Sequence, residues 1–221
     1  MLGILRELPG SRILRHWATN AEGWWFDTTR GVRTAGLLVP KQPVLSPRYR
    51  QTDFWYNATR PHTARSILAN LPIHNHHEYT FVDLGSGKGR MLLLAAEYSF
   101  SRIEGVEFAK EFHDVATDNI RRYLRKPRPC ENIHSLNLDA AEYLFPEGKI
   151  VLYFFSSFGP DLVALVLKNL TDSLRKNPRE VILVSAAPHL SWLRDRLRQA
   201  RLYHETSRYS IYQISDSRML E

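Results

Sequence analysis

The sequence predicts an α/β fold in which a doubly wound, mostly parallel sheet of seven strands follows an N-terminal extension. From Thr59 onward, short apolar runs alternate with segments whose apolar residues recur every three or four positions, a pattern typical of strands and amphipathic helices. A glycine-rich turn follows the first apolar run, and two short strand-like segments lie near the end of the chain. These observations predict five parallel strands that end in an antiparallel hairpin.

The elements follow from local patterns. The first helix begins near Thr59 and Pro61, because both residue types favour a helix start and an apolar stripe follows. Unbroken apolar runs such as Ile150–Phe155 are typical of parallel strands that helices cover on both faces. The predicted strands are 79–84, 102–107, a weak one around Ile133, 150–155, 181–185, 202–206 and 210–214. The other predicted helices are 91–98, 110–124, 160–174 and one through Trp192 and Leu197.

The sequence pattern changes from irregular to regular near residue 58, which divides the chain into an extension, residues 1–58, and a sheet-bearing domain, residues 59–221. Residues 2–17 show a loose helical pattern, whereas residues 23–50 predict a packed loop without a regular element. We expect the extension to act as a lid and to contribute to substrate recognition. Its aromatic residues either pack over the domain or line a substrate pocket: Trp24, Trp25, Phe54 and Trp55.

Composition limits the class of protein. The chain has 221 residues, of which 43% are hydrophobic and 24% charged, close to a soluble globular average. Cys130 is the single cysteine, which excludes an internal disulfide and a zinc cluster built on cysteines of one chain. The first 17 residues carry charges among their apolar residues, and no stretch is long enough to span a bilayer. We therefore expect a cytoplasmic protein.

The formal net charge of +7 permits a polyanionic partner such as RNA, because clustered cations release counterions from phosphates. Solvated helix faces are the more common explanation of such charge groups. The excess lies in two groups: Arg121, Arg122, Arg125, Lys126 and Arg128, and Arg194, Arg196, Arg198 and Arg201. His74, His76 and His77 suggest a metal site, but no acidic or cysteine partner accompanies them at ligand spacing, so we expect no metal.

The segment Asp83-Leu84-Gly85-Ser86-Gly87-Lys88-Gly89 joins a predicted strand to a helix, where backbone N–H groups and the helix dipole favour a polar ligand. A P-loop requires glycine at Val82 and serine or threonine at Gly89, so that motif fails at two positions. The dinucleotide motif G-x-G-x-x-G places its third glycine at Arg90 and fails at one. The remaining pattern is D-x-G-x-G-x-G.

This pattern resembles the glycine-rich motif of class I methyltransferases, which use S-adenosylmethionine. The resemblance implies that Gly85, Ser86, Gly87 and Gly89 bring the backbone to the amino-acid portion of the cofactor. It also implies that Asp83 contacts that portion directly or through water. A neutral or cationic ligand fits this motif better than a pyrophosphate does.

The next predicted strand ends at Glu107, about 20 residues beyond the loop, where a carboxylate can accept hydrogen bonds from ribose hydroxyls. The resemblance assigns the same role to Glu107 and implies that Phe108 flanks the adenine ring. It further implies that Asp139 and Ala140 contact the adenine amino group.

Residues 56–59 and 81–98 resemble a group of bacterial methyltransferase-like proteins and, more distantly, lysine methyltransferases with Y-x-P-T before the same loop. In those relatives the threonine helps to hold the methionine end of the cofactor, which assigns that role to Thr59, together with Tyr56. Ala58 replaces the proline of the motif.

The turn after the strand 150–155 is the candidate site for the methyl acceptor. Relatives have N-P-F-G there, and this chain has Ser156-Ser157-Phe158-Gly159. Ser156 could accept a hydrogen bond from the acceptor, and Phe158 could stack on a planar group. Alternatively, this is an ordinary turn that opens a helix, with Ser157 as its cap.

The sequence therefore predicts an S-adenosylmethionine-dependent methyltransferase. Protein lysine is the first expectation for the acceptor by resemblance, and RNA or a small molecule is the alternative. Two readings of another class stay open: a protein that binds S-adenosylmethionine without catalysis, and an NAD(P) oxidoreductase, which Arg90 and the terminal hairpin disfavour.

Overall fold

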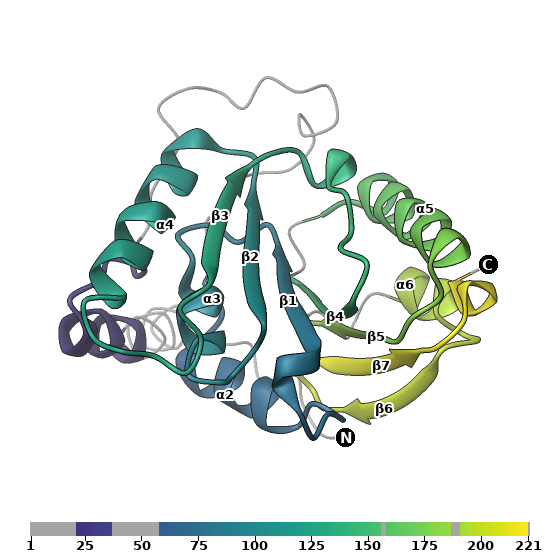
Figure 1. Cartoon of the computed structure of the whole chain (residues 1–221), viewed down its shortest axis with the longest axis horizontal. Coiled ribbons are helices and arrows are strands. Elements are labelled where there is room, and N and C mark those ends of the chain that lie inside the picture. Colours follow the sequence, from purple (N-terminus) through teal and green to yellow (C-terminus); the bar gives the residue numbers. More distant parts are fainter. Residues whose placement is uncertain (1–20, 37–57, 156–157, 187–190, 221) are drawn as a thin grey trace, which may run out of the picture.

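The computed structural model describes residues 21–36, 58–155, 158–186 and 191–220, and within these ranges seven strands form one sheet (Figure 1). The sheet order is β3-β2-β1-β4-β5-β7-β6. The strands are β1 (Tyr79–Leu84), β2 (Arg102–Glu107), β3 (Ile133–Asn137), β4 (Lys149–Phe154), β5 (Val181–Ser185), β6 (Arg201–Glu205) and β7 (Ser210–Ile214). The helices are α2 (Pro61–Ala69), α3 (Arg90–Ala95), α4 (Lys110–Tyr123), α5 (Pro160–Lys176) and α6 (Ser191–Arg196), with short 3-10 turns η1 (His76–Glu78), η2 (Ala140–Glu142) and η3 (Ser217–Leu220).

The strand directions confirm the predicted α/β fold with a mostly parallel sheet. β1 to β5 pair in parallel, while β7 runs antiparallel to both β5 and β6. The chain winds outward from β1 to β2 and β3, and then returns to place β4 on the other side of β1. Ligands of such sheets bind at this switch point, beyond the carboxyl ends of the strands.

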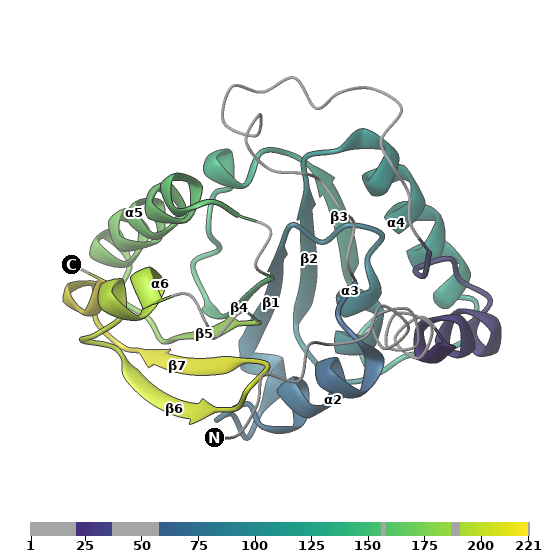
Figure 2. The ribbon, with the colours of Figure 1, turned by 180° about the vertical axis from the view of Figure 1, so that it is seen from behind.

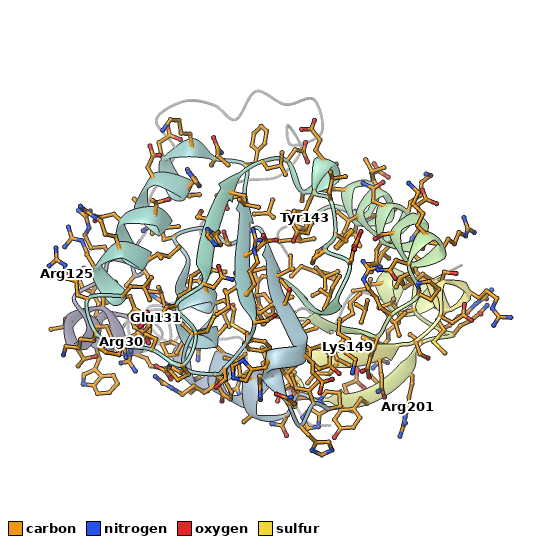
Figure 3. All side chains as sticks on the ribbon, viewed as in Figure 1. Arg30, Arg125, Glu131, Tyr143, Lys149 and Arg201 are labelled. Atoms are coloured by element: carbon orange, nitrogen blue, oxygen red, sulfur yellow. The ribbon has the colours of Figure 1, made fainter. Side chains whose placement is uncertain are left out.

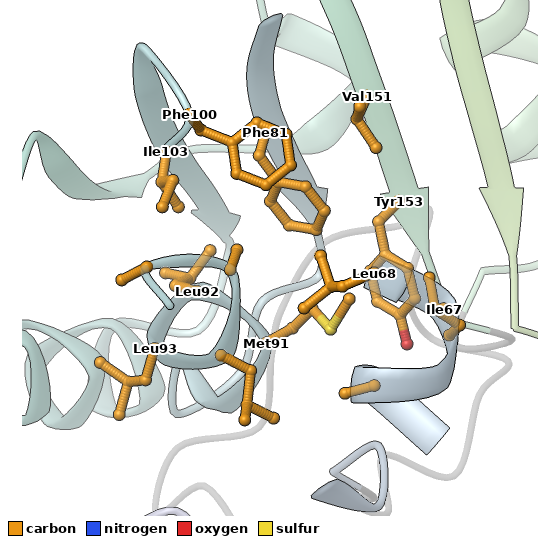
Figure 4. Packing of buried hydrophobic residues seen from close by; sticks show 14 of the residues in the cluster. Ile67, Leu68, Phe81, Met91, Leu92, Leu93, Phe100, Ile103, Val151 and Tyr153 are labelled. Atoms are coloured by element: carbon orange, nitrogen blue, oxygen red, sulfur yellow. The ribbon is translucent and has the colours of Figure 1, made fainter. Parts of the chain in front are cut away.

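Helices cover both faces of the sheet. One core cluster joins α2 and α3 to Phe81 and Tyr153, and Figure 4 shows these side chains meeting at close range. The other cluster packs α5 and α6 against residues such as Leu152 and Leu183. The reverse view in Figure 2 brings α2 and α3 in front of the sheet. Within the described part of the chain, no helix combines the length and the apolar character needed to cross a bilayer.

The prediction of a loop over residues 23–50 is wrong for its first part, because residues 21–30 are helical. The hydroxyls of Thr28 and Thr29 donate to carbonyl oxygens one turn earlier, and Phe26 is fully buried in the core. This helix depends on the burial of Phe26, which the local pattern did not reveal.

The prediction of a packed aromatic lid is wrong for Trp24 and Trp25, which are 59% and 61% exposed. Phe54 and Trp55 lie outside the described residues, as do residues 2–17.

Helix α3 is shorter than the predicted 91–98. After Ala95, the backbone hydrogen bonds shorten from four-residue to three-residue spacing, as in the bond from Tyr98 N to Ala95 O at 2.9 Å. Such tightening is common at the ends of helices.

Candidate ligand site at the glycine-rich loop

The turn between β1 and α3 has a backbone that only glycine adopts readily. Gly85, Gly87 and Gly89 have φ values of 79°, 54° and 83°. A side chain at positive φ costs about 1–2 kcal/mol, because Cβ approaches the following carbonyl oxygen. The spacing of these three glycines is therefore a requirement of the backbone.

Phe158 lies against this loop. A Cβ atom built on Gly85 would be 3.2 Å from Cζ of Phe158. The structure thus brings one of the two predicted acceptor-site residues to the loop. Ser156 lies outside the described residues, and so does Tyr56.

The expectation that the turn leaves its backbone N–H groups free for a ligand is wrong for four residues of the loop. The amides of Gly85 and Ser86 both donate to Val106 O, at 2.8 and 3.0 Å. Gly87 N donates to Oε2 of Glu107 at 2.8 Å, and Gly89 N donates to Ser86 O at 2.9 Å. The neighbouring strand β2 and the loop itself satisfy these donors, so they do not form a cradle for phosphate.

Glu107 ends β2 and is 9% exposed. Its Oε1 accepts a hydrogen bond from Ala109 N and its Oε2 one from Gly87 N, both at 2.8 Å. Burial raises the pKa of Glu107, and the two backbone donors oppose that shift. Each carboxylate oxygen has a second lone pair, so Glu107 can still accept hydrogen bonds from a ligand.

Asp83 is the second carboxylate of the site. In the sheet register it lies between Tyr153 of β4 and Gly105 of β2, and it is only 3% exposed. Among the described residues, no donor forms a hydrogen bond with its carboxylate. Burial, and secondarily the charge of Glu107, raises the pKa of Asp83 well above its usual range. A buried carboxyl group without a hydrogen-bond donor from the described residues is costly, and such a group is a candidate for contact with a cation or a hydrogen-bond donor.

Thr59 lies beside the same strand ends. Its Oγ1 is 2.5 Å from the Oη atom of Tyr153, and both residues are buried. Burial raises the pKa of Tyr153, and the charge of Asp83 adds to the shift. The structure therefore gathers Thr59 and Asp83 around one phenol that the sequence did not single out.

Ser86 has a buried hydroxyl without a hydrogen-bond partner among the described residues. A Cβ atom built on Gly105 would be 2.7 Å from this Oγ atom and 2.5 Å from Cδ1 of Leu92. Gly105 is thus needed for the loop to pack on β2. Gly105 is not among the residues predicted for the site, although a glycine within a strand often marks such a close approach.

The predicted adenine-site residues follow the ends of β2 and β3. The amide of Asn137 donates to the carbonyl oxygens of Glu107 and Phe108, both at 2.9 Å. Asp139 accepts a hydrogen bond from Ala141 N at 2.8 Å and so caps η2, and Ala140 is buried. Asn137 therefore joins the two segments that carry these candidates.

The three histidines do not form a metal cluster. In the described part of the chain, no group of three or more His, Cys, Asp or Glu side chains could hold a metal ion. The ring of His76 packs instead on Tyr98 and Phe100, with centroid distances of 5.1 and 4.9 Å.

Comparison with known proteins supports the fold. A scan against family models finds no match, and a search of curated proteins finds no significant match. Solved structures do match. An S-adenosylmethionine-dependent O-methyltransferase from Thermotoga maritima gives a TM-score of 0.53 at 14% identity and covers 73% of this chain and 67% of its own. The chain has the Rossmann-like methyltransferase fold.

Two further structures share this fold. A predicted N6-adenine-specific DNA methylase from Listeria monocytogenes gives a TM-score of 0.52 at 12% identity, over 76% of this chain and 53% of its own. The chain thus spans about half of the length of that structure. A ribosomal protein L11 methylase from Lactobacillus delbrueckii gives a TM-score of 0.50 at 14% identity, over 69% of this chain and 76% of its own.

Proposed function

We propose that this protein is a methyltransferase that binds S-adenosylmethionine at the glycine-rich loop. One observation carries the proposal: the site offers two buried carboxyl groups, Asp83 and Glu107, while the loop amides that would bind phosphate are already bonded within the protein. A ligand with an ammonium group and hydroxyl groups complements such a site, whereas a pyrophosphate would be repelled.

The residues present fit this cofactor. Asp83 and Thr59 would face its amino-acid end, and Glu107 would accept hydrogen bonds from its ribose. Residues that follow the strands would surround its adenine: Phe108, Asp139 and Ala140. When bound, S-adenosylmethionine supplies an electrophilic methyl group. The protein then has to align the acceptor and exclude water, which requires no nucleophilic side chain.

The NAD(P) oxidoreductase alternative has less support. The strand β7 lies between β5 and β6 and runs antiparallel to both, whereas dinucleotide-binding folds continue with parallel strands. Arg90 also occupies the position of the third glycine, and its side chain is engaged with Thr34. The labelling experiment distinguishes catalysis from binding of S-adenosylmethionine alone.

Protein lysine is our proposed acceptor, by resemblance to the lysine methyltransferases noted above. The contact of Phe158 with the loop supports an acceptor site at that end of β4. The matched structures carry names that refer to protein, DNA and oxygen methylation, so the fold alone favours none of them.

RNA is the second candidate acceptor. Figure 3 shows Arg125 and Arg201 on opposite sides of the molecule, so the two basic groups do not merge into one surface. In the first group, Arg121 and Arg122 both pair with Asp118. RNA as the acceptor would make affinity fall steeply with salt.

Two measurements test the proposal. Calorimetric titration should show binding of S-adenosylmethionine and no binding of NAD or NADP. Binding of NAD or NADP without binding of S-adenosylmethionine would refute the proposed cofactor. Incubation of a cell extract with a radioactive methyl donor, with and without the protein, should then label protein bands that protease removes. Label removed by ribonuclease would make RNA the acceptor, and tight binding without any labelling would favour a non-catalytic role.

A further inference from the structure

Two cationic side chains are buried at the end of the glycine-rich loop and the start of α3. Lys88 and Arg90 flank Gly89 and are 4% and 5% exposed. Buried charges need hydrogen-bond partners, and residues 34–36 of the N-terminal extension supply three of them. Nζ of Lys88 donates to Ala35 O at 3.1 Å and to Gly36 O at 2.9 Å. Nε of Arg90 donates to Oγ1 of Thr34 at 2.7 Å.

Residues 33–36, which we call the strap, are held in place by Asp27. Its Oδ2 accepts hydrogen bonds from Thr34 N at 2.7 Å and from Ala35 N at 2.6 Å, while its Oδ1 accepts one from Oγ1 of Thr34 at 2.6 Å. The same hydroxyl accepts from Arg90, so a continuous chain of hydrogen bonds runs from Asp27 through Thr34 to the loop. Phe26 and Val32 anchor this part of the extension in the core.

Asn119 of α4 joins the strap to the loop directly. Its side chain is fully buried. Oδ1 accepts a hydrogen bond from Arg33 N at 2.8 Å, and Nδ2 donates to Arg33 O at 3.2 Å and to Lys88 O at 2.9 Å. One amide therefore binds main-chain groups of both segments, at a point where the next loop residue, Gly89, has positive φ.

We propose that Asn119 is a positioning residue for the glycine-rich loop. It fixes the main chain at Lys88, and the strap fixes the side chains of Lys88 and Arg90, so the N-terminal extension helps to set the loop that carries the ligand site. Removing this support lets the loop relax away from the geometry that joins Gly87 to Glu107. The identity of the ligand rests on the proposed function, whereas the mechanical link between strap and loop does not.

The test uses the full chain with Asn119→Ala, Asn119→Asp and Thr34→Val. In all three variants, hydrogen–deuterium exchange of the ligand-free protein should become about tenfold faster over residues 85–90. A tenfold change corresponds to about 1.4 kcal/mol, the scale of one lost buried hydrogen bond. Asn119→Asp keeps the acceptor for Arg33 N but places a carboxylate against two carbonyl oxygens, so it should behave like the alanine variant. Titration with S-adenosylmethionine should show affinity about tenfold weaker.

Two control variants separate positioning from general stability. Asn177→Ala removes a side-chain amide that donates to Glu147 O at 2.7 Å, after the end of α5. Ile182→Val removes one buried methyl group from β5 and lowers overall stability by about 0.5–1.5 kcal/mol. Both should leave loop exchange and cofactor affinity within about twofold of the wild type, measured where circular dichroism shows every variant folded.

The outcomes are distinct. Unchanged loop exchange in folded Asn119→Ala and Thr34→Val would overturn the positioning role, and so would equal loss of affinity in Ile182→Val. If the wild type binds no S-adenosylmethionine, the proposed function fails, while the exchange measurement still decides whether the strap supports the loop.

Discussion

Asp83 and Tyr153 occupy paired positions on neighbouring parallel strands, and the carboxyl group of Asp83 has no hydrogen-bond donor among the described residues. The pKa of Asp83 is raised by burial and by Glu107, and the pKa of Tyr153 is raised by burial and by Asp83. This arrangement costs stability in the ligand-free protein, because an acidic group is held where its charge is poorly solvated.

Asp83→Asn should stabilise the ligand-free protein and weaken cofactor binding. A carboxyl group with a raised pKa in the folded state lowers stability as pH rises from its unfolded pKa through its folded pKa. The amide avoids that loss, so we expect the free energy of unfolding at neutral pH to rise by about 1 kcal/mol. Affinity for S-adenosylmethionine should fall at least about tenfold, because the charge-assisted bond to the ammonium is lost. Chemical denaturation measures the stability and calorimetry measures the affinity. A variant that is less stable and binds S-adenosylmethionine normally would contradict the assignment of Asp83 to the ammonium group.

Cofactor affinity should increase with pH. Asp83 and Glu107 both have raised pKa values, so protons must leave the site before it can offer full negative charge to an ammonium group. We expect affinity to rise as pH increases above the usual range for carboxyl groups, with proton release on binding. Titrations in buffers of different ionisation enthalpy report the released protons. Asp83→Asn should flatten the profile, and a flat profile in the wild type would argue against an ion pair at this position.

Glu107→Ala should weaken binding more than Glu107→Gln does. The alanine variant removes both acceptors of the Gly87 and Ala109 amides, whereas glutamine retains one oxygen. We expect a loss of about tenfold to a hundredfold for alanine, on the scale of charge-assisted hydrogen bonds. Binding of the nucleoside portion alone, tested with adenosine, should fall by the same factor if Glu107 binds ribose. Equal affinities in wild type and alanine variant would exclude that role.

Gly89→Ala should destabilise the fold, and Gly148→Ala serves as its matched control. Gly89 has a φ of 83°, and a Cβ atom there would be 3.2 Å from Cβ of Ala116. We expect a loss of about 1–2 kcal/mol in the free energy of unfolding. Gly148 is outside the positive-φ set and has no atom within 4 Å of a built Cβ, so alanine there should be neutral or slightly stabilising. Urea denaturation compares the two, and equal effects would refute the backbone argument.

Thr59 and Tyr153 should show energetic coupling. Either Thr59→Val or Tyr153→Phe alone leaves the other buried hydroxyl without this hydrogen-bond partner. Each single variant should therefore lower the free energy of unfolding by about 1–2 kcal/mol. The double variant should cost less than the sum of the single variants, because neither polar group remains. A double-mutant cycle on unfolding free energies measures this, and strict additivity would show that the contact contributes nothing.

Local signals in the sequence were sufficient for most of the sheet and for the glycine-rich loop. β1, β2, β5 and β7 have the predicted bounds. For β1 and β5 the reason is local, because a parallel strand that is buried on both faces is a nearly continuous apolar run. The three glycines were visible for a similar reason, since a backbone with positive φ excludes other residues locally. The helix at residues 21–30 was missed, because its stability comes from the burial of Phe26.

By itself the sequence determined the fold class and the position of the loop, since both depend on patterns a few residues long. Only the tertiary structure decided which groups that loop offers. Val106 and Glu107 accept hydrogen bonds from its amides, and the carboxyl group of Asp83 receives none from the described part of the chain. Asn119 binds the main chain of Lys88, 31 residues earlier, and of Arg33, 86 residues earlier. Hydrogen bonds over such separations depend on how helices and strands pack, and residue spacing along the chain does not encode them.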